Sequence, residues 1–229
     1  MQETNTAQRS TLIDYLRCLA IFLMLFYHWH FDLFFSGYLQ ESIIRHPAFV
    51  ALARLCLCLF LFCVGYSLAL NYKRHCDKQF FWRSFLGNWI KVTVSAIMIS
   101  IVTYITYPQY WVYFGILHCI SVASLIALAF FHLPKIALSI GIIMMTAYWG
   151  WDYSLPWINL QQPTLDHIDL FPWLGMVLIG LGAEHWQLHQ KFQPKPRAWV
   201  LWVSKHSLII YLLHQPLFMG LIVAYRYMA

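Results

Sequence analysis

Long apolar segments recur from one end of this chain to the other, and they constrain its fold more than any other feature. Of the 229 residues, 61% are hydrophobic and only 10% are charged, whereas soluble domains carry about 25% charged residues. The segments are continuous rather than alternating, so they predict helices and exclude a transmembrane β-barrel. Because backbone polar groups must bond internally in lipid, we predict an all-α membrane protein.

Seven of these segments are long enough to be predicted as transmembrane helices. No internal repeat, linker or low-complexity tract separates them, so we predict a single transmembrane domain over residues 1–229. The predicted spans are residues 12–35, 49–71, 86–106, 111–131, 135–150, 170–186 and 204–225.

Basic residues gather in alternate connections and so orient the predicted spans. Arg9, the 72–85 connection, Lys135 and the 187–198 connection carry cations on one side, while acidic residues collect on the other. By the positive-inside rule the N-terminus is cytoplasmic, and seven spans then place the C-terminus outside. The net charge of +6 is therefore explained by topology, and we predict no nucleic-acid partner. An additional attraction for an anionic cytoplasmic ligand is left open.

The cysteines give no sign of a metal site or a disulfide framework. Six are present, without the spacing of a zinc finger or of a secreted disulfide-rich domain. Five lie in apolar segments, and Cys76 lies in a basic connection. We predict free thiols and no bound metal.

The first apolar segment, LRCLAIFLMLFYHWHFDL, carries ionisable residues at helical spacing. Asp14 and Arg17 are three residues apart, and Arg17 and His28 are eleven apart, so all three side chains share a helical face. Asp32 lies about one turn beyond His28. Because ionisable groups within a membrane must be paired or hydrated, this stripe predicts a polar cavity lined by protein. A simple Asp14–Arg17 ion pair and a helix-to-helix hydrogen bond from His28 remain alternatives.

Other spans contribute further polar residues within apolar surroundings. His118 lies in the fourth predicted span, and Tyr211 and His214 share one face of the last. Together with His28, these imidazoles predict a cavity shared by three spans. Arg54 enters the second span near its outer end, where ligand binding and snorkelling to the surface are both consistent with its position.

Five stretches, in order along the chain, resemble the bacterial relatives of heparan-alpha-glucosaminide N-acetyltransferase. The arginine and histidine of the first stretch, Arg17 and His28, are also spaced as in the wider transmembrane acyltransferase superfamily, which includes enzymes that O-acetylate bacterial surface glycans. The five stretches are IDYLRCLAIFLMLFYHWHFDL, RLCLCLFLFCVGYSL, YFGILHCISVASL, LFPWLGMVLIG and KHSLIIYLLHQPL.

The resemblance implies a multi-pass enzyme of the bacterial inner membrane that moves an acetyl group from cytoplasmic acetyl-CoA to a sugar amine or hydroxyl on the far side. In the glycan acyltransferases the proposed catalytic histidine is that of the motif, which here is His28. The lysosomal enzyme has asparagine at that position and a catalytic histidine in its first luminal loop, for which His46 is the nearest counterpart here. The acceptor, the choice between N- and O-acylation, and a homodimer are left open.

The chemistry of acyl transfer is consistent with the polar stripe. A thioester carries its own leaving group, and an attacking amine or hydroxyl needs a base, for which histidine is suited near neutral pH. We predict His28 as this base, Asp32 as the group that orients its imidazole, and Arg17 with the inner basic connections as ligands of the CoA phosphates. Asp14, Arg54 and Tyr211 complete the residues predicted to bind acetyl-CoA. A donor to the developing oxyanion is expected from His118, Tyr211 or His214. Direct transfer and a brief acyl-histidine both remain open.

Two other membrane functions also use intramembrane histidines. A redox carrier holds haem between histidines on separate helices, although paired histidines at such spacing are not obvious here. A proton-coupled exporter uses histidine and aspartate as a relay. An absorption spectrum and an assay with labelled acetyl-CoA distinguish these functions from acyl transfer.

Overall fold

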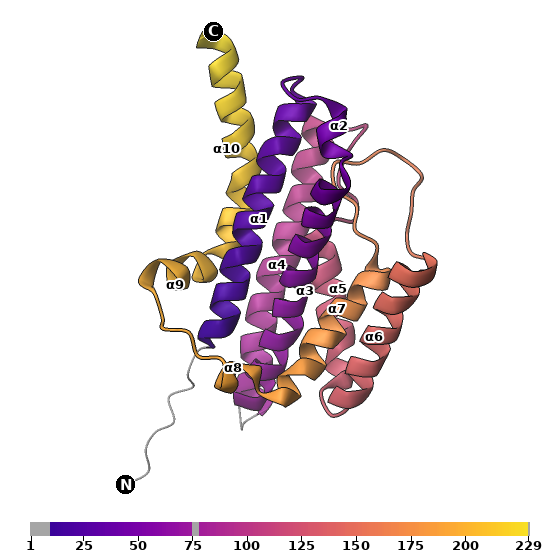
Figure 1. The fold of residues 1–229 in the computed structure, drawn as a ribbon, viewed down its shortest axis with the longest axis vertical. Coiled ribbons are helices and arrows are strands. Elements are labelled where there is room, and N and C mark those ends of the chain that lie inside the picture. The colour runs from indigo at the N-terminus through magenta and orange to yellow at the C-terminus, as the bar shows by residue number, and fades with distance from the viewer. Residues whose placement is uncertain (1–9, 75–77, 229) are drawn as a thin grey trace. The chain divides into compact units, whose positions relative to one another are not determined.

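A computed structural model describes residues 10–74 and 78–228, and in this part of the chain the regular secondary structure is helical (Figure 1). The all-α fold class is therefore confirmed for the described residues. Arg9 and Cys76, which entered the predictions of orientation and of free thiols, lie outside them. The helices are α1 (Thr11–Phe35), α2 (Glu41–Ile44), α3 (Pro47–Arg74), α4 (Lys78–Thr106), α5 (Ile116–Ala127), α6 (Pro134–Trp151), α7 (Leu170–Ala183), α8 (Leu188–Lys191), α9 (Ala198–Lys205) and α10 (Ser207–Met228), with 3₁₀ turns η1 (Leu128–Phe130) and η2 (Glu184–Trp186).

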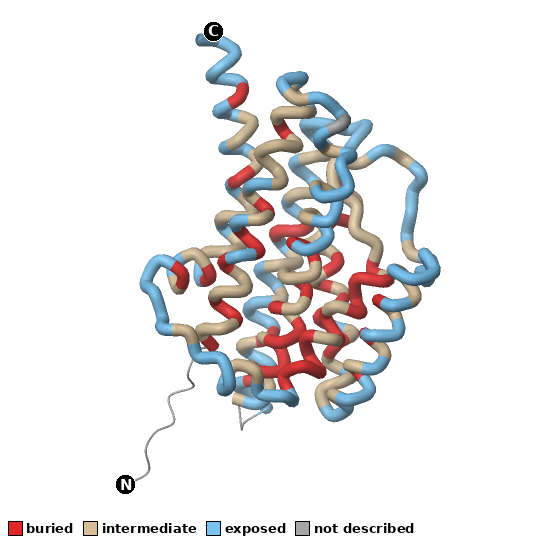
Figure 2. The backbone as a smooth tube through the Cα atoms, viewed as in Figure 1, coloured by how far each residue is buried: buried red, intermediate tan, exposed pale blue. Residues whose placement is uncertain are grey.

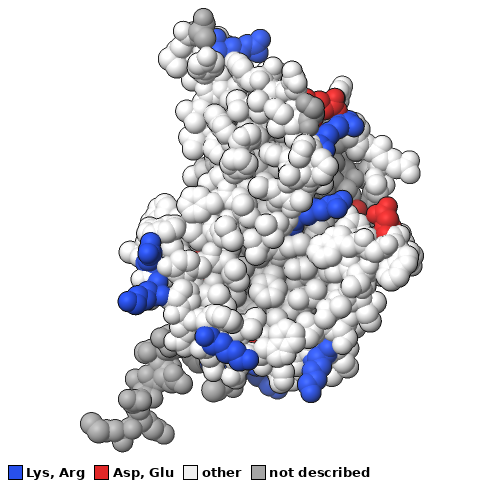
Figure 3. Space-filling model, in the orientation of Figure 1, with Lys and Arg blue, Asp and Glu red and all other residues white. Residues whose placement is uncertain are grey.

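Four helices of the described chain are long and apolar enough to cross a membrane. They are α1, α3, α4 and α10, with 25, 28, 29 and 22 residues. Most of the face drawn in Figure 3 is uncharged, as expected for a protein that lies in lipid. The protein is thus a membrane protein. Helix occupies part or all of each predicted span, but the count of seven spans and the orientation of the termini stay predictions.

Three predicted boundaries are wrong, each for a local reason. The predicted 72–85 connection is largely helical, because α3 extends to Arg74 and α4 already begins at Lys78. The fourth predicted span, 111–131, becomes helical only at Ile116, since the residues before it are extended and Phe114 forms a β-bridge with His167. The last range is divided between α9 and α10 at His206.

The chain divides into two compact units. The terminal unit comprises residues 10–60 and 193–228 of the described chain, with α1, α2, α9, α10 and the first half of α3. The central unit comprises residues 61–192, with the second half of α3 and the helices from α4 to α8. The single domain predicted over residues 1–229 stays a prediction.

Glycines set the packing of the central unit. A Cβ atom placed on Gly65 would lie 1.9 Å from the carbonyl oxygen of Val177, and one on Gly180 would lie 2.2 Å from that of Phe62. On the other side of α7, a Cβ on Gly141 would lie 2.5 Å from the carbonyl oxygen of Gly175. Helices approach this closely only where side chains are absent. As a result α7 is buried along most of its length (Figure 2).

The terminal unit is packed differently. In this unit α1 packs against both α9 and α10. Most of α10 is exposed, and its buried residues are His214 and Ile222. Large apolar side chains such as Leu213 and Leu217 cover the remaining surface of α10, as expected for a helix that faces lipid. The few buried polar groups of this unit therefore stand out against apolar surroundings.

Candidate active site

The charged residues at the beginning of α1 meet one serine of α9. Ser204 Oγ donates a hydrogen bond to Asp14 Oδ1 at 2.6 Å, and Arg17 Nη1 donates to Ser204 Oγ at 3.2 Å. Asp14 and Ser204 are each only 2% exposed. The shared partner confirms that Asp14 and Arg17 lie on one helical face. Sequence reasoning missed Ser204, because it lies 187 residues after Arg17 and carries no motif of its own.

Two of the predicted catalytic histidines are in contact further along α1. The ring centroids of His28, on α1, and His214, on α10, are 4.7 Å apart, with the ring planes tilted by 60°. His214 is only 5% exposed. The expectation that imidazoles from separate spans converge is therefore met for this pair, which we call the histidine pair.

Hydrogen bonding determines which nitrogen of His214 carries a hydrogen. Its Nδ1 lies at hydrogen-bond distance from the carbonyl oxygen of Tyr211. A carbonyl oxygen only accepts, so Nδ1 is the donor, and the neutral ring has its lone pair on Nε2. Within the described part of the chain, Nε2 of His214 and Nδ1 of His28 are buried and have no hydrogen-bond partner. These two nitrogens are therefore the unsatisfied polar atoms of the histidine pair.

The carboxylate of Asp32 is held beside this pair by Gln215, the residue after His214. With its nitrogen facing Asp32, the Gln215 amide donates to both carboxylate oxygens, at 2.7 and 3.2 Å. Asp32 is only 3% exposed, so the amide satisfies a buried charge. The role predicted for Asp32, orientation of the His28 ring, stays a prediction. Sequence reasoning missed Gln215, although an amide within an apolar segment is itself a signal.

His118 is held in the central unit by two structural hydrogen bonds. Its Nδ1 accepts from the backbone N–H of Gly115 at 3.2 Å, which caps the beginning of α5. Its Nε2 therefore carries the hydrogen and donates to Ser100 Oγ at 3.1 Å, and that hydroxyl donates to the carbonyl of Val112 at 2.7 Å. Both nitrogens are occupied, so the local structure explains His118 without a catalytic role, and the oxyanion role stays a prediction.

A family model described as heparan-alpha-glucosaminide N-acetyltransferase, catalytic, matches residues 9–216. The chain belongs to this family. The match covers the charged residues of α1 and both members of the histidine pair. No curated protein and no solved structure matches the chain. Membership of this family confirms the resemblance of the five sequence stretches and indicates a membrane acetyltransferase. Acetyl-CoA is the donor used in this family in general.

Two residues predicted for the acetyltransferase site lie at the surface of the terminal unit. His46 is exposed just before α3, where its Nδ1 accepts from the backbone N–H of Ala48 at 3.3 Å. Arg54 is also exposed. Tyr211, by contrast, belongs to the site through its backbone, whose carbonyl orients His214, and its ring centroid lies 5.5 Å from that of His214. The catalytic role of His46 and the ligand-binding role of Arg54 stay predictions.

One of the inner cations expected to attract CoA phosphates already has an acidic partner. Lys73, in the last turn of α3, forms an ion pair with Glu184, whose side chain is 3% exposed. Nearby, Tyr66 and His189 are joined by a hydrogen bond of 2.9 Å between the hydroxyl oxygen and Nδ1. Burial lowers the pKa of His189, and the cations Arg74 and Lys73 lower it further, against the opposing effect of Glu184. The contacts of Lys73, Glu184 and His189 therefore account for these residues without a bound ligand.

The described cysteines agree with the prediction of free thiols. Cys18, Cys56 and Cys119 are buried and Cys58 is partly buried, and these four form no disulfide with another described residue. Over the described ranges, no group of three or more His, Cys, Asp or Glu side chains is arranged to hold a metal ion.

Proposed function

We propose that this family member transfers an acetyl group from cytoplasmic acetyl-CoA to a sugar amine or hydroxyl on the far side of the bacterial inner membrane. The histidine pair carries the proposal, because it supplies two adjacent, buried imidazoles with unpartnered nitrogens in a chain of an acetyltransferase family. This transfer requires a base that works near neutral pH, and imidazole is the side chain suited to it.

In the proposed mechanism, one nitrogen of the pair removes the acceptor's proton. The acceptor nitrogen or oxygen attacks the thioester carbon, the carbon–sulfur bond breaks, and the CoA thiolate leaves and recovers a proton. His214 is arranged for the base role, since its Nδ1 is fixed on a carbonyl and its Nε2 holds the lone pair. A neutral His214 in this tautomer cannot donate from Nε2 to an oxyanion. We therefore assign it the role of base and not that of oxyanion donor.

His28 completes the pair in this proposal. Its ring lies next to that of His214, so the two imidazoles act as one unit in the proposed transfer. Removal of either ring should then cost nearly as much activity as removal of both.

The donor is proposed to bind toward the cytoplasmic end of α1. Arg17 lies about 16 Å from His28 along the helix, from eleven steps of 1.5 Å. A phosphate group near Arg17 would thus require an extended arm to place the thioester at the histidine pair, and the pantetheine arm of CoA is extended in this way. The buried Asp14–Ser204 contact fixes the position of the Arg17 side chain for this task.

Transfer of labelled acetyl from acetyl-CoA to glucosamine or a glycan, measured with the protein in liposomes, tests the proposal. We expect activity in the wild type and its loss in His28→Ala, in His214→Ala and in the double variant. His30→Ala is the matched control, because His30 also lies on α1 and its Nδ1 bonds to the carbonyl of Phe26 on the same helix. Transfer that survives in the double variant would overturn the proposal, and a Soret band in the purified protein would favour the haem alternative.

A further inference from the structure

The outer face of α4 carries two cations, one on each side of a glycine. Arg83, Gly87 and Lys91 follow one another at intervals of four residues, and all three are exposed. At about 100° per residue, Arg83 and Lys91 differ by about 80° around the helix, and Gly87 lies midway between them. A Cβ atom added to Gly87 would meet nothing within 4 Å in the described chain beyond its own turn of helix. The three residues therefore form an open position between two cations, which we call the α4 basic patch.

Lys91 lies inside the part of α4 that is predicted to cross the membrane. That predicted span begins at residue 86, so Lys91 is about 7 Å beyond its start. A lysine at such a depth costs free energy unless its ammonium group reaches the headgroup layer or meets an anion. Its side chain spans about one helical turn and leans toward the beginning of the helix, which brings the ammonium group to the level of Gly87. Arg83 lies one turn further in the same direction, at the level expected for lipid phosphates.

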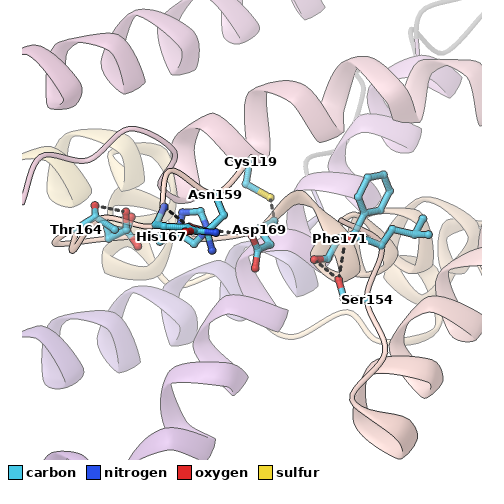
Figure 4. Close-up of polar contacts among 10 residues, drawn as sticks. Cys119, Ser154, Asn159, Thr164, His167, Asp169 and Phe171 are labelled. Atoms are coloured by element: carbon cyan, nitrogen blue, oxygen red, sulfur yellow. Dashed lines mark hydrogen bonds and ion pairs between the residues drawn. The ribbon is translucent and has the colours of Figure 1, made fainter. Parts of the chain in front are cut away.

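The positive charge of the patch is not neutralised by the described chain. Neither Arg83 nor Lys91 forms an ion pair with a described residue. An anion that balances this charge must therefore come from elsewhere. Three acidic groups of the central unit already have other partners, namely Asp166 with the Ile116 N–H (3.1 Å), Glu184 with Lys73, and Asp169 with the His167 ring (2.9 Å) in the 152–169 loop, which joins α6 to α7 (Figure 4).

Beyond the patch, the same face of α4 is apolar. The positions that follow Gly87 on this face, 7, 11, 14 and 18 residues later, are occupied by large exposed side chains, namely Val94, Met98, Ile101 and Ile105. Before the patch, Trp82 is exposed and is of the residue type that is enriched at the membrane–water interface. The face thus presents an interfacial aromatic ring, then two cations, and then hydrocarbon. A phospholipid offers the complementary sequence of a charged headgroup followed by acyl chains.

We propose that Arg83 and Lys91 bind the phosphate of an anionic phospholipid over Gly87. Two cations favour a headgroup with a net negative charge over a zwitterionic one. The phosphate satisfies Lys91 at its depth in the membrane, and the absence of a side chain at Gly87 lets the phosphate approach the helix. This contact involves no acetyl transfer, so it stands apart from the proposed function.

Two other occupants fit this face less well. A second copy of the chain, related by a two-fold axis through the face, would bring the cations of both copies together. The phosphates of CoA belong to a water-soluble molecule, whereas the α4 basic patch continues directly into an exposed apolar surface. Both occupants are distinguished from a lipid by the experiment below.

Binding of phosphatidylglycerol to the purified full-length protein, measured by native mass spectrometry from a nonionic detergent, tests the proposal. We expect the wild type to bind phosphatidylglycerol in preference to phosphatidylcholine. Arg83→Gln and Lys91→Gln should each raise the Kd for phosphatidylglycerol about fivefold, and the double variant should raise it about 25-fold. Lys78→Gln is the matched control and should leave this Kd unchanged, because it removes an exposed cation from the same helix at a position about 180° from Gly87.

Gly87→Leu separates the proposed site from its charge. The variant keeps both cations but fills the open position between them, so it should raise the Kd for phosphatidylglycerol severalfold. A Kd that is the same in the wild type and the double variant, or in the wild type and Gly87→Leu, would overturn the proposal. Displacement of the bound lipid by excess CoA would also overturn it and assign the cations to the acetyl donor. A dimer mass in place of the lipid-bound monomer would assign the face to a second copy instead.

Discussion

The two units bury different kinds of groups. The terminal unit buries ionisable and amide side chains that meet between helices, namely Asp14 with Ser204 and Asp32 with Gln215, beside the histidine pair. The central unit also buries Glu184 against Lys73, but its helices pack backbone against backbone at glycines, and its described unpartnered polar atoms lie in the 152–169 loop. Side-chain variants in the terminal unit should therefore lower mainly the rate of acetyl transfer, whereas variants in the helices of the central unit should lower mainly the stability.

The largest expected effect is the loss of the histidine pair. His214→Ala removes the proposed base and should lower kcat by about 10²- to 10⁴-fold. His28→Ala should have an effect of similar size, and the double variant should cost little more than either. Steady-state acetyl transfer checks this, with thermal unfolding in detergent as evidence that the variants fold. Multiplicative losses in the double variant would show that the two rings act independently.

In the central unit the largest expected effect is on stability. In Gly65→Ala the new Cβ would lie 1.9 Å from the Val177 carbonyl oxygen, so we expect a loss of about 3 kcal/mol. Gly87→Ala is the matched control, because its added Cβ would meet nothing within 4 Å in the described chain beyond its own turn of helix, and alanine should stabilise α4 by about 0.5–1 kcal/mol. Apparent unfolding midpoints in detergent measure both. Equal midpoints for the two variants would contradict the glycine contact.

A smaller effect is expected from Gln215→Ala. The variant leaves the buried Asp32 carboxylate without its amide donor, which should cost about 2 kcal/mol of stability. Removal of both partners, in Asp32→Ala with Gln215→Ala, should cost less than the sum of the single changes. Denaturant unfolding of the four proteins gives the coupling. Strictly additive losses would mean that the two side chains do not interact.

Much of the fold could be predicted from the sequence, because apolar runs bounded by charged residues mark helices directly. The predicted spans 12–35 and 135–150 differ from α1 and α6 by one residue at most at each end. The beginning of α5 could not be predicted in this way. The apolar residues before Ile116 are extended because they bond to the 152–169 loop, and that contact depends on tertiary structure.

The candidate site was predictable in its residues but not in its pairs. Helical spacing identified His28, Asp32 and His214 as polar groups within apolar segments. The same spacing could not show that His28 meets His214 or that Asp32 meets Gln215, because these pairs join opposite ends of the chain. Ser204 was missed for the same reason. A rule that every buried polar group requires a partner would have drawn attention to Ser204 and Gln215, the two residues that were missed.

The smallest expected effect concerns pH and Asp166, at the loop of the central unit. Burial raises the pKa of this carboxyl above its ordinary value, and the Ile116 N–H and His167 oppose that rise. The native state therefore binds the proton more tightly than the unfolded state. The resulting stabilisation is complete below the unfolded pKa of about 4 and is lost as the pH rises through the native pKa.

Asp166→Asn should flatten this part of the stability profile. The asparagine oxygen still accepts from the Ile116 N–H, which lies 3.1 Å from the carboxylate, but it does not titrate. Asp152→Asn, an exposed position in the same loop, controls for the removal of one negative charge. Unfolding midpoints measured in detergent from pH 4 to pH 7 give the two slopes. If the wild type and Asp166→Asn lose stability equally over this range, titration of the Asp166 carboxyl is not coupled to folding.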